Sequence, residues 1–90
     1  MTFVEFARDG FLFNANNIAA IYPAQNETLW YIKIIIPGGT VRLCPQEYAT
    51  EEDCIEVIKR ISSAIQMRAK TVVIRNSDPV KGVDVVYDFT

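Results

Sequence analysis

Residues 29–43, LWYIKIIIPGGTVRL, predict the β-hairpin around which the chain is organised. Apolar side chains recur at every second position, which is the period of a strand with one buried face. Consecutive isoleucines suit a pleated strand better than a helix. Pro37, Gly38 and Gly39 end the run and supply a turn. The residues expected on the buried face are Trp30, Ile32, Ile34 and Ile36.

The turn decides which residues of the two strands face each other. If Gly38-Gly39 is a two-residue loop, both glycines can take the positive φ of a type I′ turn. Ile36 then faces Val41, and Ile34 faces Leu43. This register keeps the apolar residues of both strands on one face, so we favour it.

Two other loops are open to this sequence. A Pro37-Gly38 loop sets Lys33 against Arg42, which places like charges opposite each other. A three-residue loop sets Ile36 against Thr40 and puts the apolar residues of the two strands out of phase, unless a bulge repairs the mismatch. Both are less favourable than the Gly38-Gly39 loop.

The segment before the hairpin also predicts strands. Residues 2–7 and Phe11–Asn14 flank an Asp9-Gly10 turn signal and read as a first hairpin. Asparagines at positions 14, 16 and 17 indicate a bend. Residues 18–22 favour a short strand that Pro23 ends.

A helix is predicted over residues 50–68. Thr50 is a good N-cap, and acidic residues follow it in the first turn, where the helix dipole favours them. Apolar residues with helical spacing form one stripe suited to packing on a sheet. The stripe consists of Cys54, Val57, Ile58, Ile61, Ala64 and Ile65.

A second pair of strands follows the helix. Residues 71–75 are rich in β-branched side chains, residues 76–79 are a turn cluster, and residues 83–89 alternate. The sequence therefore predicts a single α+β domain over residues 1–90. Its mainly antiparallel sheet has about five strands, followed by one amphipathic helix on one face and a C-terminal β-hairpin.

Composition excludes several classes of function. The net charge is −2 and the pI about 5.0, which argues against duplex nucleic-acid binding. The first ten residues lack the apolar segment of a secretory signal, and no apolar run approaches the ~18 residues of a membrane span. We therefore expect a cytoplasmic protein without membrane contact. His, the most common general acid/base and metal ligand, does not occur.

No motif indicates catalysis, a metal or a cofactor. Gly38-Gly39 lacks the further glycines and the Lys-Ser/Thr of a phosphate loop. Cys44 and Cys54 are too few for a disulfide scaffold or a metal site, and we expect free thiols. Cys54 fits the helix stripe, whereas Cys44 is expected to be the more exposed, beside Arg42. Ser62-Ser63 has no His to activate it. We expect no enzyme.

The outer face of the central hairpin is the candidate binding surface. In the favoured register it carries Tyr31, Lys33, Ile35 and Arg42. One helix can cover only one face of the sheet, so these residues need another cover. Exposed apolar surface usually marks a contact surface. The commonest way to cover it is two-fold association with a second copy of the chain. We therefore expect a homodimer.

The sequence favours a small protein-binding or regulatory module. The apolar-Asn-Ile-Tyr pattern of residues 13–22, followed by a glycine hairpin and an acidic helix start, is similar to that of many short bacterial and phage proteins. The resemblance covers residues 11–68 at the level of the fold. A phage or accessory inhibitor would fit this size. The alternative is a module for single-stranded nucleic acid or DNA-associated regulation, with bases stacked on a Tyr/Lys/Arg face. A small-ligand binder between subunits is a third reading.

Overall fold

The computed structural model describes residues 1–75 and 84–90, so the turn predicted at residues 76–79 lies outside the described residues. Within them the chain forms an α+β fold with mainly antiparallel strands, one α-helix on one face and a C-terminal hairpin, as the sequence predicted. The elements are β1 (Phe3–Phe6), β2 (Phe11–Asn14), the 3-10 helix η1 (Ala15–Asn17), β3 (Ala20–Asn26), β4 (Leu29–Ile35), β5 (Val41–Leu43), α1 (Glu51–Gln66), β6 (Thr71–Ile74) and β7 (Val85–Asp88).

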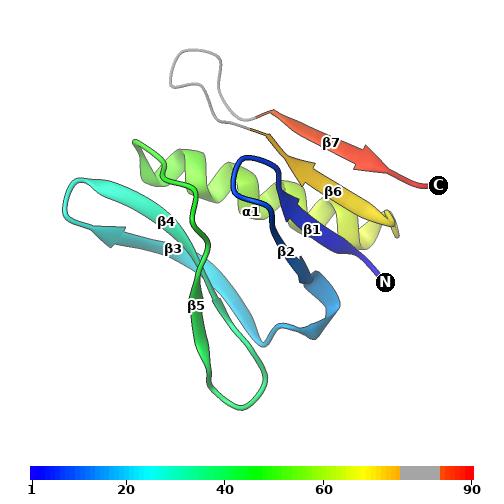
Figure 1. Cartoon of the computed structure of the whole chain (residues 1–90), viewed down its shortest axis with the longest axis horizontal. Coiled ribbons are helices and arrows are strands. Elements are labelled where there is room, and N and C mark those ends of the chain that lie inside the picture. The colour runs from blue at the N-terminus through cyan, green and yellow to red at the C-terminus, as the bar shows by residue number, and fades with distance from the viewer. Residues whose placement is uncertain (76–83) are drawn as a thin grey trace.

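The described strands form two sheets rather than one (Figure 1). The first has the order β2-β1-β6-β7, and the second has the order β3-β4-β5. β1 pairs with β6 in parallel, and the other neighbours are antiparallel. The C-terminal hairpin therefore extends the N-terminal hairpin, and the central hairpin belongs to the other sheet.

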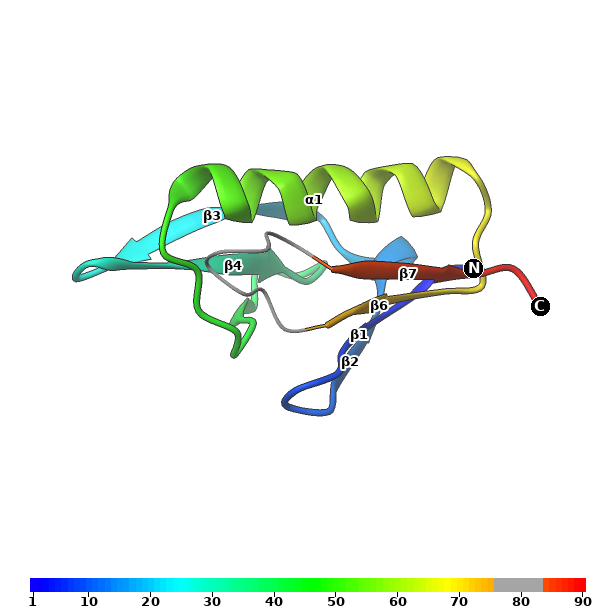
Figure 2. The same cartoon turned by 90° about the horizontal axis from the view of Figure 1, so that it is seen from above.

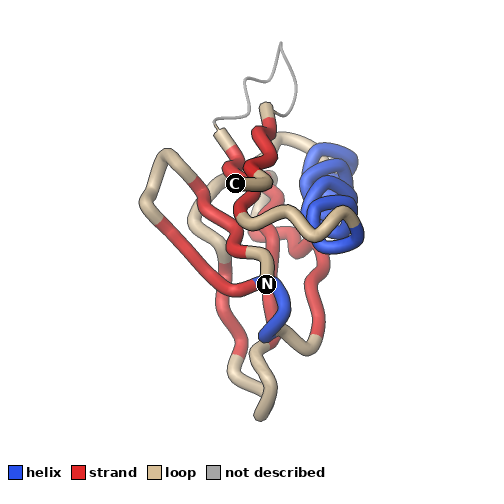
Figure 3. Tube along the Cα trace, turned by 90° about the vertical axis from the view of Figure 1, so that its right-hand side faces the viewer, coloured by secondary structure: helices blue, strands red, loops and turns tan. Residues whose placement is uncertain are grey.

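The helix α1 spans both sheets from one side (Figure 2). It contacts β3 and β4 of one sheet and β6 and β7 of the other. Figure 3 shows the same arrangement along another direction, with the helix beside the strands. The Thr50 side chain caps the helix by accepting from the Asp53 backbone N–H at 3.2 Å, as predicted. The buried helix residues are Cys54, Val57, Ile61 and Ala64, all from the predicted stripe.

The core lies between the helix and the inner faces of the sheets. Ile32 and Ile34 of β4 are buried there, as are Val4 and Phe6 of β1. Phe6 also joins the two aromatic rings of β2, with ring centroids 6.1 Å from Phe11 and 6.4 Å from Phe13. The Thr2 hydroxyl holds the start of the chain against the segment after the helix. It donates a hydrogen bond to the Ala69 backbone carbonyl at 2.6 Å.

Strand β3 is longer than the sequence predicted. It runs through Pro23 to Asn26 instead of ending at the proline. Because β3 is an edge strand of its sheet, a residue without a backbone N–H removes no interior ladder bond. The predicted bend before β3 is present as η1, where the Asn14 side chain accepts from the Asn16 backbone N–H at 2.9 Å.

The predicted register of the central hairpin is wrong. The Ile36 N–H donates to the Thr40 carbonyl at 2.8 Å, which closes a three-residue loop in which both glycines have positive φ. Ile34 consequently faces Arg42, and Lys33 faces Leu43. The prediction assumed that the apolar residues of both strands share the core.

That assumption fails because β5 lies at the edge of its sheet. Its residues do not reach the core: Val41 and Leu43 are 47% and 52% exposed. Because β5 itself has no buried residue, the register is set by the turn geometry and by Cys44, which is buried directly after the strand.

Candidate functional site

The observed register defines one continuous surface, the side of β3-β4-β5 that faces away from α1. We refer to it as the outer face of the second sheet. Residues directly opposite each other in an antiparallel pair lie on the same face, so the pairing identifies its members. They are Ala20, Tyr22, Ala24, Asn26, Leu29, Tyr31, Lys33, Ile35, Val41 and Leu43.

Three of the residues predicted for this surface come together on it. Tyr31, Lys33 and Ile35 alternate along β4 on the side opposite the buried Ile32 and Ile34. The fourth, Arg42, pairs with Ile34 and lies on the other side of the sheet. A register shift of one residue turns a whole strand over, so the surface loses a cation and gains the two apolar residues of β5.

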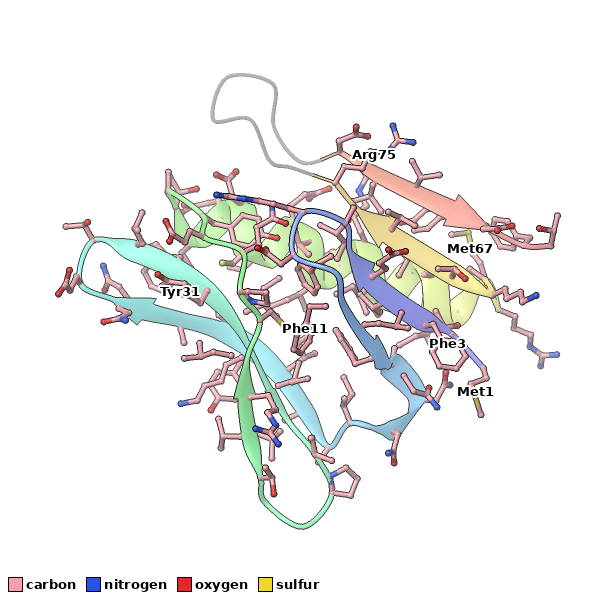
Figure 4. The ribbon with its side chains drawn as sticks, viewed as in Figure 1. Met1, Phe3, Phe11, Tyr31, Met67 and Arg75 are labelled. Carbon is pink, nitrogen blue, oxygen red and sulfur yellow. The ribbon has the colours of Figure 1, made fainter. Side chains whose placement is uncertain are left out.

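Most side chains of this surface are apolar or aromatic, and the amide of Asn26 lies at its end. Lys33 is its one charged residue, and its Nζ lies 5.7 Å from the centroid of the Tyr22 ring. This distance is within the range of a cation–π interaction. Tyr22 is 37% exposed, and Tyr31 on the same face is half-buried. The arrangement is an open, mostly aliphatic and aromatic plane with one fixed positive charge, and Figure 4 shows Tyr31 within it.

The register also moves Cys44, which we expected to be exposed. Cys44 is buried, and its N–H donates to the Ile32 carbonyl at 2.8 Å, which continues the β4–β5 pairing by one residue. Burial raises the pKa of the Cys44 thiol to about 12, with a smaller contribution from Cys54. Burial likewise raises the pKa of Cys54 to about 12. Both are free thiols, and Cys54 lies in the core as predicted.

Stability is expected to fall as the pH rises from about 9 to about 12. The unfolded thiols ionise near pH 9, while Cys44 and Cys54 in the folded chain stay protonated to about pH 12. In this window the unfolded state binds fewer protons, so stability decreases by up to about 1.4 kcal/mol per pH unit for each thiol. Urea titrations at a series of pH values measure the slope. It should be smaller in Cys44→Ala, and an unchanged slope would contradict the assignment.

Tyr48 closes the core beside these thiols. Its backbone exchanges two hydrogen bonds of 2.8 Å with Trp30, which extends the pairing along β4 beyond β5. Its hydroxyl is buried and has no hydrogen-bond partner among residues 1–75 and 84–90. Burial raises the pKa of this hydroxyl. The phenol therefore remains neutral and acts as a packing group.

The described ranges contain no group of three or more His, Cys, Asp or Glu side chains placed to hold a metal ion. No helix within them is long and apolar enough to cross a membrane. No protein-family model matches the chain, and no curated protein or solved structure matches it significantly. The outer face of the second sheet, predicted from the alternation along β4 and corrected by the observed register, is the candidate site.

Proposed function

We propose that the chain is a small protein-binding module whose working surface is the outer face of the second sheet. The observation that carries the proposal is the exposure of apolar side chains there. Tyr22, Val41 and Leu43 are 37%, 47% and 52% exposed and lie on one face, on the two edge strands β3 and β5 that flank β4. Exposed apolar side chains gathered on one face of a sheet are typical of a protein contact.

The shape and charge of the surface favour a protein over other partners. Small ligands are usually held in concave pockets, whereas an open sheet face offers a plane. Nucleic acids require several cations, and the pairing leaves only Lys33 on this face because Arg42 lies on the opposite side. An apolar plane with one central charge suits a partner that buries most of it.

A module for single-stranded nucleic acid is the second candidate. The specific observation in its favour is that Tyr22, Tyr31 and Lys33 share the face, since bases stack on aromatic rings beside cations. We rank it second because a backbone-tracking groove needs more than one positive charge.

We further propose that the protein-binding module is a regulator, which acts by covering a partner's surface and by self-association. An accessory or phage-type inhibitor in the cytoplasm is one form of such a protein. The exposed apolar residues on the outer face of the second sheet support this idea, because a partner's surface can cover them.

The double variant Val41→Ser/Leu43→Ser is expected to abolish partner binding and leave the fold intact. Both side chains are about half exposed, so the changes remove contact area and not core packing. The tagged protein is used for pull-down from a native lysate, with and without nuclease. Met67→Ser, which removes a similarly exposed apolar group beyond the helix, is the matched control.

The proposal requires that the double variant lose proteins which the parent and Met67→Ser both recover. An identical set of proteins from all three chains would overturn it. Recovery that disappears after nuclease treatment would favour the nucleic-acid candidate instead.

A further inference from the structure

The first sheet has a second open surface, on the side facing away from its buried residues. Val4, Phe6, Val72 and Ile74 of this sheet are buried, so the alternate residues face outward. We refer to these as the outer face of the first sheet. Its members, identified from the pairing, are Leu12, Asn14, Phe3, Glu5, Thr71, Val73, Val86 and Asp88.

This face is also apolar, but its charge has the opposite sign. Leu12, Phe3 and Val86 are 59%, 38% and 37% exposed. The charged members are Glu5, on the inner strand β1, and Asp88, on β7. The Asp88 carboxylate accepts from the backbone N–H and the hydroxyl of residue 90 at 2.9 and 2.6 Å, which lowers its pKa and keeps it ionised.

The two outer faces therefore complement each other. Both present exposed apolar side chains, and one carries Lys33 where the other carries two carboxylates. Figure 4 shows Tyr31 of the second sheet and Phe3 of the first on opposite sides of the view, so one chain does not bring these two residues together. Contact between the faces requires two chains.

We propose that a second copy of this chain covers the outer face of the second sheet with its own outer face of the first sheet. This inference rests on the proposed function and names the partner surface. Lys33 then lies opposite the carboxylates of Glu5 and Asp88, while the apolar residues around them are buried. Because α1 covers one side of both sheets, both outer faces open on the other side (Figure 2). A two-fold axis can thus place two equivalent contacts in one dimer.

Contact between like faces is disfavoured by the same charges. Lys33 is on the central strand β4, so two second-sheet faces would bring lysine against lysine. Two first-sheet faces would bring Glu5 against Glu5. Like charges opposed in a contact cost affinity, whereas opposite charges fix the orientation of the partners.

Exchange of the two charges tests the proposal. Lys33→Glu and Glu5→Lys are each expected to weaken dimerisation about 10- to 100-fold, because each creates like charges at both contacts. The double variant Lys33→Glu/Glu5→Lys should dimerise more tightly than either single variant, since the pair formed by positions 33 and 5 is restored with reversed signs while the Asp88 carboxylate is unchanged. Sedimentation equilibrium measures all three. Lys59→Glu on the exposed surface of α1 has the same charge change as Lys33→Glu and should leave dimerisation unchanged.

A mixture gives the sharpest result. Lys33→Glu chains and Glu5→Lys chains are each expected to be monomeric alone and to form a dimer of twice 10.2 kDa when combined. Recovery in the mixture also shows that both variants are folded. If Glu5→Lys alone dimerises like the parent, the first-sheet face is not the partner surface and the proposal is overturned.

The same experiment separates this inference from the proposed function. A parent chain that stays monomeric at high concentration overturns the self-contact. If the monomeric parent still recovers proteins from the lysate and the Val41→Ser/Leu43→Ser variant does not, the protein-binding module stands, with a partner other than a second copy of the chain.

Discussion

Replacement of Ile34 with alanine is expected to lower the free energy of unfolding by about 2–5 kcal/mol, the cost of a buried large-to-small change. Ile34 is 2% exposed at the centre of the second sheet, under the helix. Loss of the buried side-chain atoms leaves a cavity between the second sheet and α1, because neither element can move far enough to fill it. Urea denaturation measured by circular dichroism gives the change in midpoint.

The neighbouring Ile35→Ala is the matched control. It removes the same atoms from the same strand, but Ile35 is on the outer face and only half-buried. We expect a loss of less than about 1.5 kcal/mol, because part of this side chain is already in contact with water. Equal losses in the two variants would mean that α1 does not define the inner side of β4.

Cys44→Asp is expected to have an effect as large or larger, about 3–5 kcal/mol or loss of the folded state. An aspartate there would place an uncompensated charge in the core. Leu43→Asp, one residue earlier, should cost less than about 1 kcal/mol because Leu43 is 52% exposed on an edge strand. Thermal and urea denaturation of the two variants measure the difference.

Which of the two variants loses more stability shows which register the hairpin has. With the three-residue loop, Cys44 faces the core and Leu43 faces outward. With a Gly38-Gly39 loop, the two residues would exchange faces and the aspartate would be tolerated at Cys44. A Leu43→Asp chain that is less stable than Cys44→Asp would therefore refute the observed register.

Local signals explain what the sequence predicted correctly. The helix follows from the spacing of its apolar stripe and from the Thr50 cap, and both depend on residues within a few positions of each other. The first hairpin follows from the Asp9-Gly10 signal, and Gly10 has a φ of 67° there. Alternation along β4 was enough to place Tyr31, Lys33 and Ile35 on one face.

Non-local choices explain what it missed. The position of Arg42 depends on the length of a loop whose glycines permit more than one turn, and no buried residue of β5 selects among them. The pairing of β1 with β6 joins segments separated by the whole of the second sheet and the helix. The sequence predicts a strand end at Pro23, because an edge position cannot be recognised until the neighbours of β3 are known.

The outer face of the first sheet was missed for a related reason. Its residues come from hairpins at the two ends of the chain, and each hairpin alone shows only a few alternating positions. Leu12 and Val86 become parts of one surface only when β1 and β6 pair. Alternation within Phe11–Asn14 could have marked Leu12 as opposite in phase to its aromatic neighbours.

The parallel pairing of β1 with β6 has a consequence for synthesis of the chain. β1 is an inner strand of its sheet, but its second neighbour, Thr71–Ile74, is synthesised only after the second sheet and α1, which lie between them in the sequence. Until β6 is made, the edge of Phe3–Phe6 opposite β2 has no strand beside it. Unpaired strand edges are where incompletely folded chains associate wrongly. The first sheet can therefore form only when the hairpin of β6 and β7 is present. A chain shortened before Thr71 is expected to aggregate instead of folding slowly.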